Sequence, residues 1–270
     1  MHPMFAFSES ADRWLPAQHH TNGPLSIDRL RVATYNVWFD PFELKRRCAA
    51  VLSILAEEDA DVIALEEVTQ PFLELLLKTP WVREQYRVSR DRVEPAQRYD
   101  VVMLSRMPGR FLAHGLTSIM GRRMHTLEFD TTEGSLAVAG VHLESMRDQT
   151  PARLTQIEEC LPVLNQARSA IWVGDFNAAP ETEEDARIRA HFADSWADLE
   201  SSPGYTRDTT RNTMLARIKD DRHQRIDRIF VKSDCFVPRE IRLLGTDALD
   251  SAGEVFPSDH FGLVAELERR

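Results

Sequence analysis

The chain has 270 residues, of which 43% are hydrophobic and 28% are charged. This composition is typical of a soluble globular protein and excludes a disordered or collagen-like polymer. The formal net charge of −10 argues against nonspecific coating of long nucleic acid or of an anionic membrane, but it leaves room for a local basic groove.

The first residues include the turn-prone sequence NGP (22–24) and lack the basic and continuous apolar regions of a signal peptide. Apolar runs elsewhere are far shorter than the roughly 20 residues that span a bilayer. No CxxC pair occurs among the three cysteines, Cys48, Cys160 and Cys235. Scattered cysteines suit a reducing compartment. We therefore expect residues 1–29 to form a tail or a strap, and the protein to be soluble and cytoplasmic.

Past this segment, short apolar runs alternate with amphipathic stretches. The apolar runs predict strands at residues 31–38, 61–66, 85–90, 99–105, 109–116, 123–130, 135–142, 170–174, 225–232, 236–244 and 261–267. Apolar residues at helical spacing predict helices over 44–58, through Phe72 and Leu76, and over about 150–168. Strands interleaved with helices imply an α/β architecture in which helices cover sheets. Because no linker or break in composition divides it, we expect one domain over residues 30–270.

Two segments share the order strand, helix, strand. In residues 31–68 and again in residues 135–177, both strands end in polar residues. Ligands in α/β proteins bind at the carboxyl ends of such strands. If two similar layers pack face to face, all four strand ends meet at one rim.

Polar side chains stand at the ends of several apolar strands, where they are costly unless they are hydrogen-bonded or charge-paired. They are Asn36, Glu67, His142, Asp175, Asn177, Asp227, Asp259 and His260. A single one of them would be explained as a helix cap or a turn residue. A whole set drawn from Asn, Glu, Asp and His is harder to explain in this way.

This set of residues suits metal-assisted phosphoryl chemistry. Mg²⁺ prefers carboxylate oxygens and keeps several waters, so one or two acidic ligands suffice. A second carboxylate can activate the attacking water, and a histidine held by its own carboxylate can donate to the phosphoryl oxygens. We therefore expect Mg²⁺ as the cofactor, with Mn²⁺ as the alternative.

The motifs that carry these residues resemble those of the endonuclease/exonuclease/phosphatase superfamily. They are TYN (34–36), LEEV (65–68), GDFN (174–177) and SDH (258–260), and they occur in the order of that superfamily. The resemblance implies a deoxyribonuclease I-like fold, which is a four-layer α/β sandwich of two mixed β-sheets flanked by helices. It would cover about residues 30–268.

Within the superfamily, three further stretches resemble the type 2 tyrosyl-DNA phosphodiesterases. They are HLESMR (142–147), YTRDTTRN (205–212) and LLGTDALD with FPSDHFGL (243–250 and 256–263). Enzymes of this family remove a tyrosine that is joined through its hydroxyl to a 5′ phosphate of DNA. The resemblance implies a metal-dependent phosphodiesterase of DNA repair. Its expected partner is a nucleic-acid end, namely single-stranded DNA with a 5′ adduct.

The same resemblance implies a role for each site residue. Glu67 binds Mg²⁺ with Asp259 beside the metal, and Asp175 activates the water. Asn36 and Asn177 position phosphate and nucleophile. His260, oriented by Asp227, steadies the transition state. The residues expected to contact substrate are His142, Ser145, Arg147, Arg207 and Asn212.

Three positions depart from the family pattern. Glu66 stands where relatives usually have Gln, and we expect it to be solvated. Phe176 stands in GDFN where relatives more often have Thr. Arg207 replaces the tryptophan on which the family lays a base of single-stranded DNA, although a guanidinium can also stack or bind phosphate.

Charge is unevenly distributed along the chain. Residues 204–232 carry eight basic and four acidic side chains, whereas residues 181–200 carry seven acidic and two basic ones. The basic stretch predicts a surface that binds a short nucleic-acid end. The alternative interpretation of this stretch is a solvated arginine-rich loop.

Other functions stay open at this point. The same fold serves nucleases and phosphatases that act on abasic DNA, RNA or small phosphoesters, and lipid phosphodiesterases. A catalytically silent binding module is a further alternative, but Glu67, Asp175 and His260 are all present. We expect no membrane docking, no appended interaction domain, and a monomer.

Overall fold

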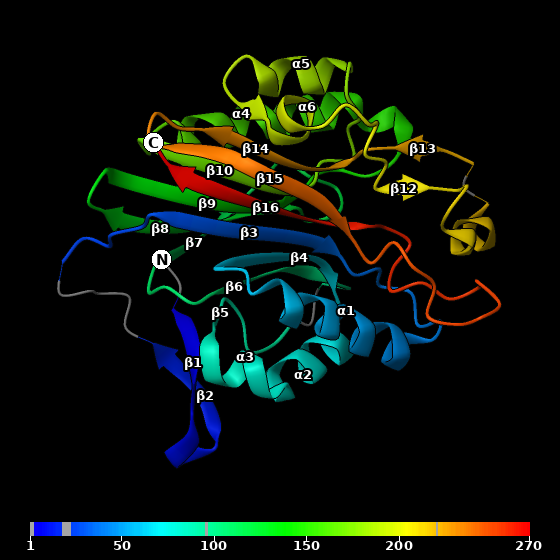
Figure 1. Ribbon diagram of the computed structural model, residues 1–270, viewed down its shortest axis with the longest axis horizontal. Coiled ribbons are helices and arrows are strands. Elements are labelled where there is room, and N and C mark those ends of the chain that lie inside the picture. The colour runs from blue at the N-terminus through cyan, green and yellow to red at the C-terminus, as the bar shows by residue number, and fades with distance from the viewer. Residues whose placement is uncertain (1–2, 18–22, 95–96, 220) are drawn as a thin grey trace.

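The computed structural model describes residues 3–17, 23–94, 97–219 and 221–270. Two large β-sheets pack face to face, and helices cover the outer face of each (Figure 1). The predicted four-layer α/β sandwich is confirmed.

The first sheet has eight strands among the described residues, in the order β15-β16-β3-β4-β6-β5-β1-β2. Its strands are β1 (Met4–Ser8), β2 (Arg13–Ala17), β3 (Arg29–Asn36), β4 (Val62–Val68), β5 (Arg87–Val88), β6 (Asp100–Ser105), β15 (Phe236–Leu244) and β16 (Gly262–Arg269). At its centre β3 and β4 run parallel, with Asn36 beside Glu66.

The second sheet has six strands in the part of the chain that is described, in the order β11-β14-β10-β9-β8-β7. Its strands are β7 (Arg110–Gly115), β8 (Arg123–Thr131), β9 (Gly134–His142), β10 (Ser169–Asp175), β11 (Ala193–Asp194) and β14 (Asp227–Lys232). Parallel strands β9 and β10 end with His142 beside Asp175, and antiparallel β14 begins with Asp227 opposite Asp175. A separate short hairpin joins β12 (Arg207–Asp208) to β13 (His223–Gln224).

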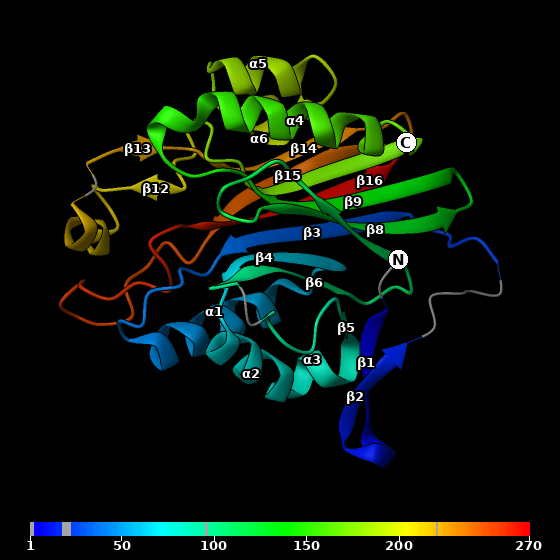
Figure 2. The same cartoon turned by 180° about the vertical axis from the view of Figure 1, so that it is seen from behind.

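Helices lie on both outer faces (Figure 2). The first sheet is covered by α1 (Leu44–Glu58), α2 (Gln70–Lys78) and α3 (Pro80–Gln85), and the second by α4 (Thr150–Leu164) and α5 (Glu183–Arg189). Helix α6 (Ser195–Leu199) packs against β14 and β15, one strand from each sheet. The described residues also include the short 3-10 helices η1 (Glu9–Ala11), η2 (Arg147–Gln149) and η3 (Thr213–Ile218). Within the described ranges, no helix combines the length and apolarity that crossing a bilayer requires.

Three layers of apolar side chains hold the sandwich together. Between the sheets, the inward residues of β3, β4, β9, β10 and β14 include Val32, Ala64, Val138, Val173 and Ile229. The opposite faces of these strands pack on α1–α3 and on α4–α5. Because the parallel strands are buried on both faces, their sequences are nearly continuous apolar runs.

Most predicted elements lie within a few residues of their observed bounds, but the strand predicted at 85–90 is shorter than expected and comprises only Arg87–Val88. Pro80 starts helix α3, a position that suits proline, and only two residues remain for β5. In the segment predicted as a tail or a strap, β1 and β2 form a hairpin, and β1 pairs with β5. Residues 1–2 and 18–22 of that segment lie outside the described residues.

Candidate active site

The predicted strand ends meet where the two sheets face each other. The side-chain amide Nδ2 of Asn36, at the end of β3, donates to Asp175 Oδ2 at the end of β10 across 3.0 Å. His142 Nε2, at the end of β9, lies 3.5 Å from Asp175 Oδ2 and 3.9 Å from Glu67 Oε1 of β4. The convergence predicted from the two strand-helix-strand segments is therefore confirmed by geometry.

Glu67 stands on a β-bulge. The pairing of β4 with β6 shifts between Leu65 and Val68, which leaves one extra residue on β4, and Glu67 adopts a left-handed backbone with φ of 59°. A bulge turns a side chain away from the alternation of its strand. Such a backbone is costly for a residue other than glycine and is typical of functional sites. The bulge thus directs the Glu67 carboxylate into the site.

The Glu67 carboxylate is 9% exposed, and its Oε2 accepts a hydrogen bond of 3.0 Å from the backbone N–H of Phe39. Burial and the nearby charge of Asp259 raise the pKa of Glu67 to about 7, while His260 opposes this shift. The carboxylate therefore lies among other acids, and the positive charge of His260 does not offset the effects of burial and of these acids on its pKa. Such a group attracts a hard cation.

Asp175 is held on both carboxylate oxygens. Oδ1 accepts from the backbone N–H of Asn177 at 2.9 Å, and Oδ2 accepts from Asn36. Burial and the charge of Asp227 raise the pKa of Asp175 to about 6, with His260 opposing. The group is thus ionised at neutral pH, yet basic enough to accept a proton.

His260 and Asp227 form a buried pair. Asp227 Oδ2 lies 2.7 Å from Nδ1 of the imidazole. Burial alone lowers the pKa of His260, but the charges of Asp227 and Asp259 outweigh it and raise the pKa to about 10. His260 is therefore an imidazolium at neutral pH, and with Nδ1–H bound to Asp227 it keeps Nε2–H as a donor toward the site.

His142 has the opposite protonation state. Burial, then the charges of Arg122 and His260, hold the pKa of His142 well below its ordinary value. Arg122 Nη1 lies 3.0 Å from Nδ1 of the ring. Because a guanidinium only donates, Nδ1 is the acceptor and the proton of the neutral ring sits on Nε2. His142 thus offers an N–H toward the acids.

Ser145 and Asn177 complete this side of the site. Ser145 Oγ accepts from Arg122 Nη2 at 2.8 Å and lies 3.4 Å from Asn177 Nδ2. Asn177 also donates to the carbonyl of Leu143 at 3.2 Å and has a left-handed φ of 49°. Arg147 is exposed at the start of η2.

On the other side, Arg207 Nη2 donates to Asp259 Oδ2 at 3.3 Å, and the Arg207 side chain is only 11% exposed. The position expected to stack a base thus carries a cation paired with an acid of the site. Asn212 is buried, donates to the carbonyl of Ser258 at 2.8 Å and caps η3. These contacts give Asn212 a positioning role, because both ends of its amide are bound within the protein.

Two places in the site offer carboxylates to a metal ion, and they differ in the positive charge that the protein already supplies. Asp175, Asp227 and His260 place one ligand atom each within 4.8 Å of one another, a spacing that could hold an ion. There, however, the imidazolium of His260 already supplies positive charge. At Glu67 the charge of His260 is outweighed by burial and by the negative charge of Asp259. The donor set therefore fits a hard divalent cation best at Glu67.

Two departures from the family pattern are explained by burial. Glu66 is fully buried and not solvated, so this prediction was wrong; Thr34 Oγ1 donates to Glu66 Oε1 at 2.9 Å. Burial, then the charge of Asp227, raises the pKa of Glu66 well above its ordinary value. Phe176 points into the core, where its ring packs on the rings of Trp172 and Phe230, each at 5.0 Å. It does not touch the chemistry of the site.

The charge asymmetry has a partly structural explanation. Arg225 and Arg228 of the basic stretch are buried against Asp194 of the acidic stretch, and Arg228 also pairs with Asp185. Lys232 lies at the far end of β14, where it donates to carbonyls after α4. These three cations are therefore not available to a nucleic acid at the site.

One basic and one aromatic residue of the site, Arg122 and Tyr99, were not predicted from the sequence. Arg122 holds His142 and Ser145, and its guanidinium lies 5.4 Å from the ring centroid of Tyr99, which stacks near His142 at 5.9 Å. The hairpin of β8 and β9 turns at Gly134, and its register extends to place Arg123 opposite His142. The same pairing, predicted from the sequence of the hairpin, would have indicated that Arg122, the residue before Arg123, lies near His142.

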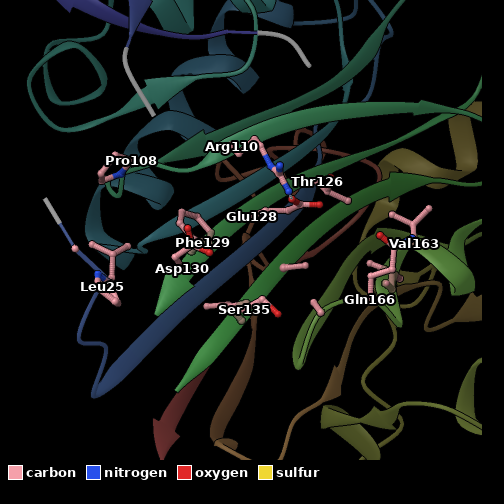
Figure 3. A pocket seen from close by; sticks show the side chains of 16 residues that line it. Leu25, Pro108, Arg110, Thr126, Glu128, Phe129, Asp130, Ser135, Val163 and Gln166 are labelled. Atoms are coloured by element: carbon pink, nitrogen blue, oxygen red, sulfur yellow. Dashed lines mark hydrogen bonds and ion pairs between the residues drawn. The ribbon is translucent and has the colours of Figure 1, made fainter. Parts of the chain in front are cut away.

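A groove of about 700 Å³ lies elsewhere, on the outer face of the second sheet beside the end of α4 (Figure 3). Leu25, Thr126, Glu128, Ser135 and Gln166 are among the residues that line it. None of the predicted site residues borders this groove, so the polar cluster at the strand ends remains the candidate active site.

The sequence pattern of the Endonuclease/Exonuclease/phosphatase family matches residues 33–260. The chain belongs to this family. It is 28% identical over 252 residues to tyrosyl-DNA phosphodiesterase 2 of Gallus gallus, a match that covers 87% of this chain and 66% of that protein. The chain thus spans just under two thirds of the length of this relative.

Solved structures show the same fold. Truncated TDP2 of Caenorhabditis elegans has a TM-score of 0.76 at 22% identity and covers 89% of this chain and 97% of its own. D. rerio TDP2 in complex with a single-stranded DNA product has a TM-score of 0.74 at 24% identity, with coverage of 90% and 100%. The predicted resemblance to this family and the deoxyribonuclease I-like fold are confirmed, and family membership agrees with the prediction of a phosphoester hydrolase.

Proposed function

We propose that this protein is a Mg²⁺-dependent phosphodiesterase that hydrolyses the 5′-phosphotyrosyl bond of DNA–protein adducts in DNA repair. The observation that carries the proposal is the meeting of Asn36, Glu67, His142 and Asp175 at the ends of four strands from two sheets. The name of the relative from Gallus gallus supports the choice of substrate.

Glu67 would hold the metal ion, and Asp259 lies close enough for its charge to act on Glu67. A bound divalent cation would supply Lewis-acid stabilisation of the charge that accumulates on the phosphoryl oxygens. The fit rests on the bulge at Glu67 and on a buried carboxylate whose pKa stays raised although the charge of His260 acts on it.

Asp175 is the general base in this proposal. Hydrogen bonds from Asn36 and from the N–H of Asn177 fix its carboxylate while it accepts a proton from the attacking water. The water oxygen forms a bond to phosphorus as the bond from phosphorus to the tyrosine oxygen breaks. General base help of this kind contributes about 10²–10⁴-fold to the rate.

Two histidines would stabilise the phosphoryl oxygens through N–H donors. His260 provides a cationic donor held by Asp227, and His142 provides a neutral donor held by Arg122. Preorganised donors of this kind cost no reorganisation during the reaction. Tyrosine leaves with a phenol pKa of about 10, so it needs less protonation than an alkyl alcohol would.

The DNA strand would approach along the β12–β13 hairpin. Arg207 lies on this hairpin beside Asp259, and a guanidinium can bind phosphate or stack on a base. We also infer a monomer and a reducing, cytoplasmic setting; the three buried free cysteines support the reducing setting.

The test is a set of three labelled substrates incubated with the purified protein in Mg²⁺ or in EDTA. One is a single-stranded oligonucleotide with a 5′-phosphotyrosine, one an abasic-site duplex and one a plain single strand. The proposal expects metal-dependent release of tyrosine that leaves a 5′ phosphate. Cleavage of only the abasic duplex or the plain strand would instead assign the protein to the alternative nucleases of the family.

A further inference from the structure

Three large apolar side chains stand exposed beside the candidate active site: Ile119 and Met120 in the loop between β7 and β8, and Met146 in the loop after β9. Their exposed fractions are 83%, 40% and 65%. Only six large hydrophobic side chains are exposed in the described part of the chain, so half of them gather here. We call these three residues the apolar ridge. A gathered exposed apolar surface marks a site of interaction more often than scattered residues do.

Buried polar groups hold the two loops of the apolar ridge together. The carboxylate of Glu144, which is fully buried, accepts from Ser118 Oγ at 2.5 Å and from the backbone N–H of Met120 at 3.2 Å. Arg153, also buried, donates to the carbonyl of Met146 at 2.7 Å. The side chains are thus presented on a fixed backbone and do not belong to freely moving loops.

The backbone at Met146 is strained as well. Its φ of 76° lies in the region that favours glycine. Backbone strain that the surrounding structure maintains in this way is typical of functional sites. This observation is independent of the exposure of the ridge.

The apolar ridge adjoins His142, which would donate to the phosphoryl oxygens, and the Arg122 side chain that holds it. Arg122 Nη2 donates to Ser145 Oγ and to Met120 Sδ, at 2.8 and 3.4 Å, while Nη1 of the same side chain lies 3.0 Å from His142 Nδ1. Tyr99, Met120, Arg122 and His142 also border one small pocket. A molecule held at His142 therefore extends directly onto the ridge.

The order of the strands separates two ends of the site. Along the second sheet the sequence β14, β10, β9, β8 places Asp227, Asp175 and His142 in a row. The basic β12–β13 hairpin precedes β14 at one end, and the apolar ridge flanks β8 and β9 at the other. A DNA strand is drawn to the basic end by its phosphates. The part of the substrate on the other side of the phosphorus is not DNA and meets apolar side chains.

We infer that the apolar ridge binds the peptide part of a tyrosyl–DNA adduct, through apolar residues that flank the tyrosine. This inference rests on the proposed function. It makes the preferred substrate a peptide fragment attached to DNA, in contrast to a bare tyrosine. The bond that breaks and the fate of the proton are the same as for the bare adduct.

The test compares three oligonucleotides that carry a 5′-phosphotyrosine: one with tyrosine alone, one with a heptapeptide whose tyrosine is flanked by Leu and Phe, and one whose tyrosine is flanked by Ser and Gly. The protein is compared with the double variant Ile119→Thr/Met146→Gln, which keeps the shape of the ridge but makes it polar. Leu199→Gln, an exposed position on α6, is the matched control. The readout is the ratio of kcat/KM between the apolar-flanked peptide and tyrosine alone.

We expect a ratio of about 10 for the wild type and the control, because part of two apolar side chains is buried on binding. In the double variant the ratio falls to about 1. Turnover of tyrosine alone together with a wild-type ratio of 1, or a double variant that keeps the wild-type ratio, overturns the inference and leaves the proposed function intact. Absence of turnover on all three oligonucleotides defeats the proposed function and the inference with it. A lower molecular mass of the double variant in light scattering would assign the ridge to a second copy of the chain, and so also overturn the inference.

Discussion

The side chain of Asn36 donates a 3.0 Å hydrogen bond to Asp175, and this contact joins the end of β3 in one sheet to the end of β10 in the other. Both residues are almost completely buried. The packing of the two sheets therefore sets the position of the proposed general base. Catalytic geometry and the stability of the sandwich depend on the same interface.

Replacing Asp175 by asparagine should lower kcat at least about 10²-fold, because an amide cannot accept the proton of the attacking water. The variant keeps an oxygen that can accept from Asn36 and has nearly the same volume, so folding should be preserved. Single-turnover kinetics measure the effect, with Asp198→Asn on exposed α6 as the matched control. An unchanged rate would refute the role of Asp175.

Glu66→Gln should stabilise the protein, increasingly so as the pH rises. The folded-state pKa of Glu66 is raised above its ordinary value of 4.5 by burial, so its stabilising contribution is complete below pH 4.5 and is lost as pH rises through the folded pKa. Glutamine removes this loss and keeps an oxygen to accept from Thr34. Urea unfolding at pH 5 and pH 8 should show a gain at pH 8 of about 1–3 kcal/mol. Equal gains at both pH values would contradict the assigned cause.

The affinity for Mg²⁺ should depend on pH through Glu67. Its pKa of about 7 means that a proton occupies the carboxylate at lower pH and must leave when the metal binds. The affinity should therefore rise with pH up to about 7 and change little above it. Calorimetric titration with Mg²⁺ between pH 5.5 and 8.5, on the protein without DNA, measures this dependence. An affinity that does not vary below pH 7 would exclude Glu67 as the ligand.

Arg207→Trp should change how salt affects DNA binding. It removes one cation from the β12–β13 hairpin and adds an aromatic face worth about 1–3 kcal/mol in stacking on a base. The slope of log K against log salt for a single strand should become less steep by about 0.7, and binding should tighten. Fluorescence anisotropy over a range of salt concentrations gives both quantities. Neither change would be seen if this hairpin lay outside the DNA path.

Much of the site could be predicted because it depends on strand ends. Asn36, Glu67, His142 and Asp175 each follow an apolar run, and parallel strands bring such ends to one edge. The sequence also sufficed for α1, whose apolar spacing gave its observed bounds of Leu44–Glu58. These features depend only on residues that are close together in the sequence, so the sequence of this chain alone is enough to predict them.

Features that depend on contacts across the fold were missed. Glu66 was expected in solvent, but it lies two residues after Ala64 on β4 and so shares the face of that strand that is buried between the two sheets. Arg225 and Arg228 were counted as surface charge, although their partners lie in a different segment. The pattern of residues within one segment cannot predict an ion-pair partner that lies far away along the chain.

The most direct measurement of the central claim is the release of tyrosine from a 5′-phosphotyrosyl oligonucleotide by the wild type, Glu67→Ala and Glu66→Gln, in Mg²⁺ and in EDTA. The two variants alter adjacent buried carboxyls, of which only Glu67 is turned into the site by the bulge. The account predicts Mg²⁺-dependent release by the wild type and by Glu66→Gln, and loss of release in Glu67→Ala, with all three proteins folded. Release by Glu67→Ala at the wild-type rate, or release that persists in EDTA, would contradict it.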